Sequence, residues 1–403
     1  MVIEHYLKAC AEAFGRTDRG IWNYEDGCVL IGLNALYEAG GGEEYFHAMR
    51  AFIDRYVGED GTIRLYDPSE FNLDYIPSGR VLFPLLERTG REKYRAAIEC
   101  LMAQLRHQPR TRAKSFWHKR IYPNQVWLDG LYMGLPFYAM YETRFGAPPR
   151  FEDILLQFAN ARETLYDEAQ RLYYHAYAEN RDIFWCDKAT GRSRNFWTRA
   201  IGWLLMAFAD VYELLPNGGP RESLLAGWRE AMDGMLCRRD PQTGLFWQLT
   251  ALPDVEGNYL ETSGSLMVAY SLMKGARLGV WPNEGYAAAG VDILLAVEAL
   301  MFRLDKGTLH LGGICKGAGL GPEGNLRRDG SVAYYLSEAV VEDEQKGVGV
   351  CMMAYAEFLR LEAAGLVRGP NVELFMQKYD PVLPQEIARL EAEKTRTKAG
   401  GLA

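Results

Sequence analysis

Residues 196–215 read FWTRAIGWLLMAFADVYELL, and this stretch decides the fold class. Its apolar side chains recur three and four positions apart, which is the period of an α-helix. Charged residues are nearly absent from it. Because a helix without a polar face is normally buried on all sides, the stretch predicts the interior of an all-helical protein.

The same outline occurs six times along the chain. Each time, an aromatic or acidic lead-in opens a nearly uncharged helix, and a turn separates it from a more charged, amphipathic helix. Six inner and outer helices in alternation predict an all-α fold, an (α/α)6 toroid of about twelve helices. An open solenoid would need polar capping repeats, and the sequence has none. The six lead-ins are residues 23–27, 72–79, 126–130, 196–203, 260–265 and 346–350.

The longer connections predict where a binding site would be. Residues 171–197 and 237–264 are rich in turn residues and predict short β-hairpin-like loops, which a toroid gathers at one mouth. The glycine-dense residues 310–325 predict another mouth loop. We expect residues 1–368 to form a single barrel domain that carries the active site, and residues 369–403 to form a C-terminal helix and a polar tail.

Composition and charge exclude several classes of protein. With 403 residues, 48% of them hydrophobic, the chain can bury a large core without disulfides or metals. A net charge of −8 argues against a nucleic-acid or anionic-membrane surface. The N-terminus is no signal peptide, no apolar run could span a membrane, and the seven cysteines are scattered. We therefore expect a cytoplasmic protein, a monomer or a weak homo-oligomer.

The familiar cofactor and nucleophile motifs are missing from the sequence. There is no phosphate-binding loop, no dinucleotide fingerprint, no HExxH pair and no GxSxG elbow. The six histidines are far apart along the chain. We therefore expect neither a metal nor a cofactor.

The residues that remain for chemistry are carboxylates among aromatic side chains. Asp129 lies between Trp127 and Tyr132 at a predicted helix start, where an unpaired buried carboxylate would be costly. It is either a helix-start residue stabilised by the helix dipole or a general acid. Burial would raise its pKa and the helix N-terminus would lower it. Asp74 occupies the matching place in the preceding lead-in, where it is either a turn residue or a second acid facing the same cavity.

Two further residues suggest contact with an anionic ligand. Arg199 lies on a nearly uncharged predicted inner helix, with Trp203 one turn later. Such an arginine needs either a substrate carboxylate or an internal partner, for which Asp129 and Asp74 are candidates. His175 follows a loop and is the histidine expected to reach the mouth.

At these residues the sequence resembles the unsaturated rhamnogalacturonyl hydrolases of glycoside hydrolase family 105, to which the unsaturated glucuronyl hydrolases of family 88 are related. The resemblance rests on five motifs in family order: YPNQVWLDGLYMG, FWTRAIGW, LETSGSLMVAYSLMKG, DGSVAYYLSE and KGVGVCMMAYAE. It extends from about Trp22 to Phe358. The (α/α)6 barrel that it implies agrees with the six helix pairs.

The resemblance also implies an activity. It points to a hydrolase that removes a Δ4,5-unsaturated uronic acid, foremost a galacturonyl residue, from the non-reducing end of lyase-generated oligosaccharides such as the unsaturated rhamnogalacturonan disaccharide. The family hydrates the C4=C5 enol ether of that sugar. On the matching motifs, Asp129 is the implied general acid/base and Asp74 the second acid. The implied substrate contacts are Trp22, Tyr24, Trp127, His175, Trp197, Arg199 and Trp203.

Other functions stay open at this point. A glucuronyl hydrolase acting on ulvan or glycosaminoglycan fragments would use the same mechanism, and sulfated substrates would require basic residues at the mouth, for which Arg192, Arg194, Arg327 and Arg328 are candidates. A sugar 2-epimerase on an α/α barrel usually pairs two histidines in its cavity, and only His175 is expected there. A non-catalytic helical scaffold would need neither the acid nor the arginine.

Overall fold

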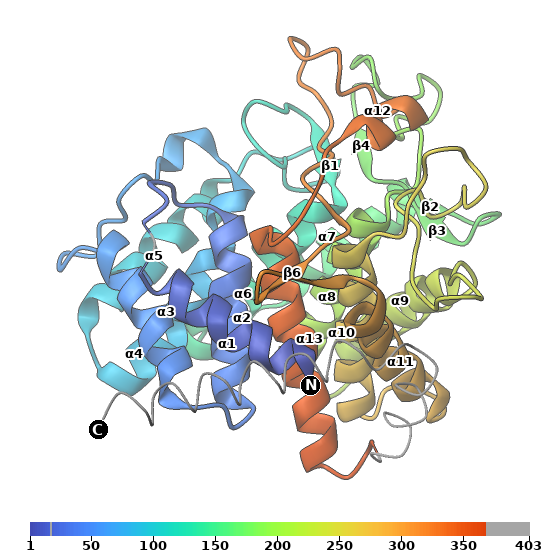
Figure 1. Ribbon diagram of the computed structural model, residues 1–403. Coiled ribbons are helices and arrows are strands. Elements are labelled where there is room, and N and C mark those ends of the chain that lie inside the picture. The colour runs from blue at the N-terminus through green and yellow to red at the C-terminus, as the bar shows by residue number, and fades with distance from the viewer. Residues whose placement is uncertain (17, 368–403) are drawn as a thin grey trace.

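Six inner helices form a closed ring around the axis of the molecule (Figure 1). The computed structural model describes residues 1–16 and 18–367. Inner helices contact one another in ring order, and α13 packs on α2 and closes the ring. The 3-10 helices η2 and η3 lead into the short α4 and complete its place in the ring. The inner helices are α2 (Tyr24–Glu38), α4 (Leu82–Thr89), α6 (Leu128–Phe145), α8 (Thr198–Leu214), α10 (Thr262–Arg277) and α13 (Gln345–Ala363), preceded in the α4 segment by η1 (Pro68–Glu70), η2 (Leu73–Tyr75) and η3 (Pro77–Val81).

Burial of the inner ring follows from its sequence. Every residue of α8 from Thr198 to Tyr212 is buried, which confirms the expectation from residues 196–215. Small residues set the distance between neighbours where α13 crosses α2. A Cβ atom at Gly349 would overlap the backbone of Cys28, so only glycine permits this approach.

The outer ring is completed from the N-terminus. α1 packs against α13 and α3, and the backbone N–H groups of Val2 and Ile3 donate to the Glu298 carboxylate of α11. The predicted toroid is confirmed, but the outer partner of its last inner helix is the first helix of the chain. The outer helices are α1 (Val2–Phe14), α3 (Glu43–Tyr56), α5 (Glu92–His107), α7 (Glu152–Leu165), α9 (Gly219–Leu236) and α11 (Gly285–Leu300).

In the part of the chain that the structure describes, eight short strands form four two-stranded antiparallel sheets in the connections that lead into inner helices. Strands β1 and β4 and the short helix α12 (Val332–Ser337) lie together at the top of Figure 1. Only β2–β3 and β5–β6 are local hairpins, because the other two sheets join distant segments. The predicted loop at 171–197 contains β3 and β4, whereas residues 237–264 hold isolated bridges and no hairpin. The strands are β1 (Gln125–Trp127), β2 (Tyr166–Asp167), β3 (Leu172–Tyr173), β4 (Ala176–Ala178), β5 (Phe302–Asp305), β6 (Thr308–Leu311), β7 (Ile314–Cys315) and β8 (Val340–Val341).

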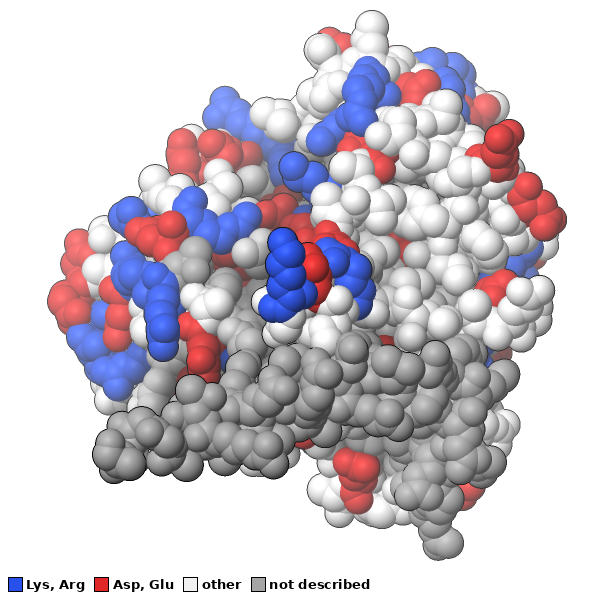
Figure 2. All heavy atoms as spheres, in the orientation of Figure 1, with Lys and Arg blue, Asp and Glu red and all other residues white. Residues whose placement is uncertain are grey.

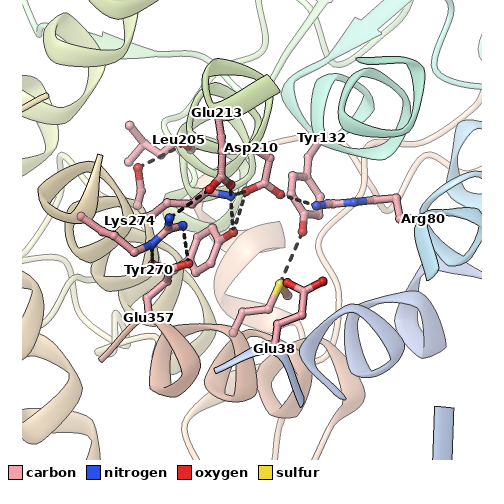
Figure 3. A network of polar contacts seen from close by, with 12 residues as sticks. Glu38, Arg80, Tyr132, Leu205, Asp210, Glu213, Tyr270, Lys274 and Glu357 are labelled. Carbon is pink, nitrogen blue, oxygen red and sulfur yellow. Dashed lines mark hydrogen bonds and ion pairs between the residues drawn. The ribbon is translucent and has the colours of Figure 1, made fainter. Parts of the chain in front are cut away.

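A network of buried charges lies between the inner helices, away from their mouth ends (Figure 3). Lys274 of α10 lies 2.8 Å from both Asp210 and Glu213 of α8. Arg80 of η3 reaches Asp210 at 2.6 Å, and Tyr270 donates to the same carboxylate. These contacts tie three segments of the inner ring together beneath the mouth.

On the face shown in Figure 2, acidic and basic side chains interleave. No described helix is both long and apolar enough to cross a bilayer. The predicted C-terminal helix and tail at 369–403 lie outside the described residues, as does residue 368 of the predicted barrel domain 1–368.

Candidate active site

The N-terminal ends of the inner helices meet at the mouth, and a small sheet places the chemistry there. Asp129 is the second residue of α6, directly after strand β1. In the β1–β4 pair Trp127 faces Ala176, and the backbone N–H of Leu128 donates to the carbonyl of His175 at 3.1 Å. This pairing brings His175 beside Asp129, although 46 positions separate them in the sequence numbering.

Asp129 and His175 face each other through atoms that have no hydrogen-bond partner. Nε2 of His175 lies 3.3 Å from Oδ2 of Asp129, and the imidazole is fully buried. The two groups are close but not aligned for a hydrogen bond, and each of these atoms lacks one among the described residues. Because buried polar atoms are nearly always bonded in native proteins, this pair indicates a place where a polar ligand binds.

The electrostatic surroundings decide the charge of Asp129. Burial by itself would raise its pKa, but the contact with His175 and the electrostatic effects of the His175 and His118 rings hold the pKa below its ordinary value. The carboxyl is therefore ionised at neutral pH in the free protein. The competition between burial and helix start, which the sequence leaves open, is resolved in favour of the carboxylate.

Asp74 lies in η2 and is already paired. Its carboxylate lies 2.5 Å from Nζ of Lys119 and 3.5 Å from Nε2 of His118. Burial lowers the pKa of Lys119, but the Asp74 charge and hydrogen bond outweigh it and hold the pKa above its ordinary value. Lys119 thus stays cationic and pairs with Asp74, whose carboxylate is largely buried.

Sequence reasoning missed His118 and Lys119, so the expectation that His175 is the only histidine of the cavity is wrong. His118 is 3% exposed and stacks on Trp127 at 4.5 Å between ring centres. Burial lowers its pKa to about 4 in spite of Asp74, so the ring is neutral at pH 7. The only signal was position, since HK lies at 118–119, a few residues before the lead-in to Asp129. Basic loop residues are ordinarily solvated, and this position alone did not distinguish them.

Aromatic rings enclose the two imidazoles. Trp127 stacks on His118 and meets His175 edge-on at 5.4 Å, and Trp197 lies 4.8 Å from His175 on its other side. The hydroxyl of Tyr335 lies 2.7 Å from Nδ1 of His175. Trp127, Trp197 and His175 are thus brought together as the resemblance implies, and Tyr335 is an addition from the motif DGSVAYYLSE.

The other predicted aromatic contacts lie around and below this group. Tyr24 is influenced by the charges of both Asp74 and Arg199, and burial raises its pKa well above its ordinary value. Trp203 is buried one turn into α8 and meets Tyr24 edge-on at 6.3 Å. Trp22 is also buried, and its indole N–H donates to a backbone carbonyl in η2. Trp203 therefore packs beside Tyr24, whereas Trp22 is anchored to η2.

Arg199 is 1% exposed and has partners inside the barrel wall. Its guanidinium donates to Ser263 and to the carbonyl of Cys315, and lies 3.9 Å from Glu261. The candidate partners Asp129 and Asp74 are thus wrong, and Glu261 is the carboxylate that it meets. Nε of Arg199 has no hydrogen-bond partner among the described residues, and the guanidinium lies over the ring of Trp197.

Within 1–16 and 18–367, no group of three or more His, Cys, Asp or Glu side chains is arranged to hold a metal ion. The chemistry available at the mouth is therefore built from Asp129, the two imidazoles, the Lys119–Asp74 pair and Arg199.

The chain is similar to known glycoside hydrolases over nearly its whole length. Residues 3–362 match the family model described as Glycosyl Hydrolase Family 88. A solved structure of a family 105 glycoside hydrolase from C. acetobutylicum is similar, with a TM-score of 0.85 and 38% identity over 89% of this chain and 99% of that one.

Two curated relatives are also similar in sequence. Protein Atu3128 of Agrobacterium fabrum is 42% identical over 233 residues, 57% of this chain and 99% of the relative. The unsaturated rhamnogalacturonyl hydrolase YesR of Bacillus subtilis is 28% identical over 264 residues, 64% of this chain and 72% of YesR. The chain belongs to the family 88 and 105 group of unsaturated uronyl hydrolases, and it is a glycoside hydrolase.

Proposed function

We propose that the enzyme removes a Δ4,5-unsaturated galacturonyl residue from lyase-generated oligosaccharides by hydrating the C4=C5 enol ether. This proposal rests on the different surroundings of the two acids, Asp129 and Asp74. Asp129 has a buried oxygen without a hydrogen-bond partner among the described residues, whereas Asp74 is paired with Lys119 at 2.5 Å. Direct displacement of a glycoside uses two working carboxylates, and protonation of an enol ether needs only one.

The reaction follows from that single acid. Asp129 in its protonated form gives a proton to C4, and positive charge develops at C5 and the ring oxygen. Water then adds at C5 and returns a proton to Asp129, and the resulting hemiketal opens and releases the aglycone. Because the free carboxyl is ionised, the proton has to be taken up with substrate. A uronate carboxylate bound nearby raises the pKa of Asp129 by like-charge repulsion.

The basic residues at the mouth favour an unsulfated substrate. Arg192 lies 4.0 Å from Asp167, Arg194 lies 3.9 Å from Asp329, and Arg327 lies 2.9 Å from Glu338. Of the four candidate arginines, Arg328 alone has no acidic partner among the described residues. Similarity to YesR supports a rhamnogalacturonan-derived substrate over glucuronyl ends from ulvan or glycosaminoglycans.

A sugar 2-epimerase can no longer be set aside for lack of a second histidine in the site. Two imidazoles, His118 and His175, lie at the mouth, so the lack of a second histidine no longer excludes it. Each of them faces a carboxylate at 3.3–3.5 Å, and the family assignment favours hydrolysis.

Digests made with polysaccharide lyases test the proposal. The purified protein is incubated with digests of rhamnogalacturonan, polygalacturonate, ulvan and chondroitin, and loss of the ene-carboxylate ultraviolet absorbance is followed. The expected result is fastest loss with the rhamnogalacturonan digest and release of free rhamnose-ended product. Preference for ulvan or chondroitin fragments would assign the enzyme to glucuronyl ends, and no loss with any digest would reject the hydration chemistry.

Arg199 provides a prediction about recognition. If its guanidinium receives the uronate carboxylate, Arg199→Lys should raise KM at least several-fold, because a point charge replaces a planar two-pronged donor. Steady-state kinetics on the best digest measure this, and thermal melting measures the fold. A variant with unchanged KM and kcat but a lower melting temperature would show that Arg199 serves only Glu261 and the barrel wall.

We also propose a cytoplasmic location and a monomeric or weakly associating protein. All seven cysteines lie in the described residues as free thiols, which suits a reducing compartment.

A further inference from the structure

A strap between the outer and inner rings brings a tyrosine onto the back of His175. Residues 312–344 carry β7, α12 and β8, and α12 presents two adjacent tyrosines, Tyr334 and Tyr335. Tyr335 is fully buried, and its hydroxyl reaches Nδ1 of His175 at 2.7 Å. Its backbone carbonyl accepts from Gln248, which in turn accepts from the indole of Trp197 at 3.0 Å. Gln248 and Trp197 thus help to fix the position of Tyr335.

A neutral imidazole has one N–H, and its location depends on the partner of each nitrogen. If the phenol donates to Nδ1, the proton of a neutral His175 ring lies on Nε2, the nitrogen that is 3.3 Å from Oδ2 of Asp129. In the other tautomer a lone pair on Nε2 would face the carboxylate and repel it. Burial raises the pKa of Tyr335 well above its ordinary value, so the phenol keeps its proton.

We infer that Tyr335 is a positioning residue: its hydroxyl donates to Nδ1 of His175 and so keeps the ring N–H on Nε2, the nitrogen that lies nearest Asp129. An N–H donor on Nε2 favours the ionised form of Asp129, which takes up a proton from solvent when the anionic substrate binds. The role in turnover rests on the proposed function, whereas the tautomer is a property of the free protein. The buried orphan atoms Nε2 and Oδ2 are then the pair that a substrate hydroxyl or water bridges.

The test compares two single-atom deletions on α12. Tyr335→Phe removes the hydroxyl at His175, and Tyr334→Phe is the matched control, since the Tyr334 hydroxyl donates instead to the carbonyl of Gly319. Nitrogen NMR of the six histidine rings, with His175→Ala used to assign the signal, reports the tautomer without any substrate. We expect a single Nε2–H form in the parent and in Tyr334→Phe, and a mixed form in Tyr335→Phe.

Kinetics provide the second readout. In Tyr335→Phe, kcat should fall by about three- to tenfold, the usual weight of one buried hydrogen bond, with KM nearly unchanged. An unchanged ring spectrum in Tyr335→Phe overturns the inference even if the parent consumes unsaturated sugar. A changed spectrum upholds the tautomer assignment even if the parent consumes none, in which case the proposed function fails alone. Equal loss of kcat in both tyrosine variants would assign the effect to the strap and overturn the positioning role.

Discussion

Replacement of Asp129 by asparagine should lower kcat by ~10²–10⁴, the usual share of general acid–base catalysis. The amide keeps the shape of the side chain but has no titratable proton to give to C4. KM should change little, because the aromatic walls and the cations of the pocket remain. Turnover is measured on whichever lyase digest the parent consumes fastest, and folding is checked by thermal melting.

A matched helix-start aspartate controls for the dipole effect. Asp153 is the second residue of α7, as Asp129 is of α6, but it lies on the outer ring and holds Arg110 through two hydrogen bonds of 2.6 and 2.7 Å. Asp153→Asn should cost some stability and leave kcat unchanged. If Asp129→Asn lost only the ~0.3–1 kcal/mol of a helix-start charge and kept near-parental turnover, Asp74 would become the candidate acid.

The inner ring was predictable because its signal is local. An uncharged helix with an acidic or aromatic lead-in is visible within twenty residues, and the predicted lead-ins stand at the starts of the inner segments, as at Asp129 and Arg199. The role of α1 was not predictable in this way. Its partners in α13 and α11 lie hundreds of residues away, and no periodicity reports a contact of that range.

The site residues also differ in how far they could be predicted from local sequence. Asp129, His175 and Trp197 lie in motifs that could be compared with a family, and the structure brings them together. Lys119 lies in a loop where sequence alone suggests solvent, and its burial depends on a carboxylate from another segment. The charge state of Asp129 could not be predicted from the sequence either, because its pKa depends on two imidazoles that tertiary structure brings close to it.

Lys274→Met should lower the free energy of unfolding by about 3–5 kcal/mol, which is the cost of breaking one side of a buried ion pair. For a chain of this length the melting temperature should then fall by roughly 4–6 °C. Lys274 is buried among Asp210, Glu213 and Tyr270, and their charges and hydrogen bonds hold its pKa well above its ordinary value against the opposing effect of burial. Removing the ammonium deletes its ion pairs with the buried Asp210 and with Glu213 (Figure 3). Thermal and denaturant unfolding measure the loss.

The partners that remain determine the size and the pH dependence of this effect. Asp210 keeps Arg80 at 2.6 Å and Glu213 keeps Arg277 at 3.0 Å, so neither carboxylate is left alone. Burial opposes ionisation of Asp210, yet its cations lower its pKa to about 2. That depressed pKa contributes stability that is fully present above about pH 4, the ordinary pKa of an aspartate, and is lost as the pH falls toward 2. The penalty in Lys274→Met should therefore shrink on acidification, as Asp210 becomes easier to protonate.

An exposed lysine makes the comparison specific to burial. Lys8 pairs with Glu4 at 2.9 Å on the surface of α1, with 54% of its side chain exposed, so Lys8→Met should change stability by less than about 1 kcal/mol. Asp210 lies twelve residues beyond the start of α8, about 18 Å along the helix axis. Folded Lys274→Met should therefore keep the parental kcat below its melting temperature. Equal destabilisation by the two lysine variants would contradict a structural role for the buried network, and loss of kcat in the folded protein would show that it also controls the mouth.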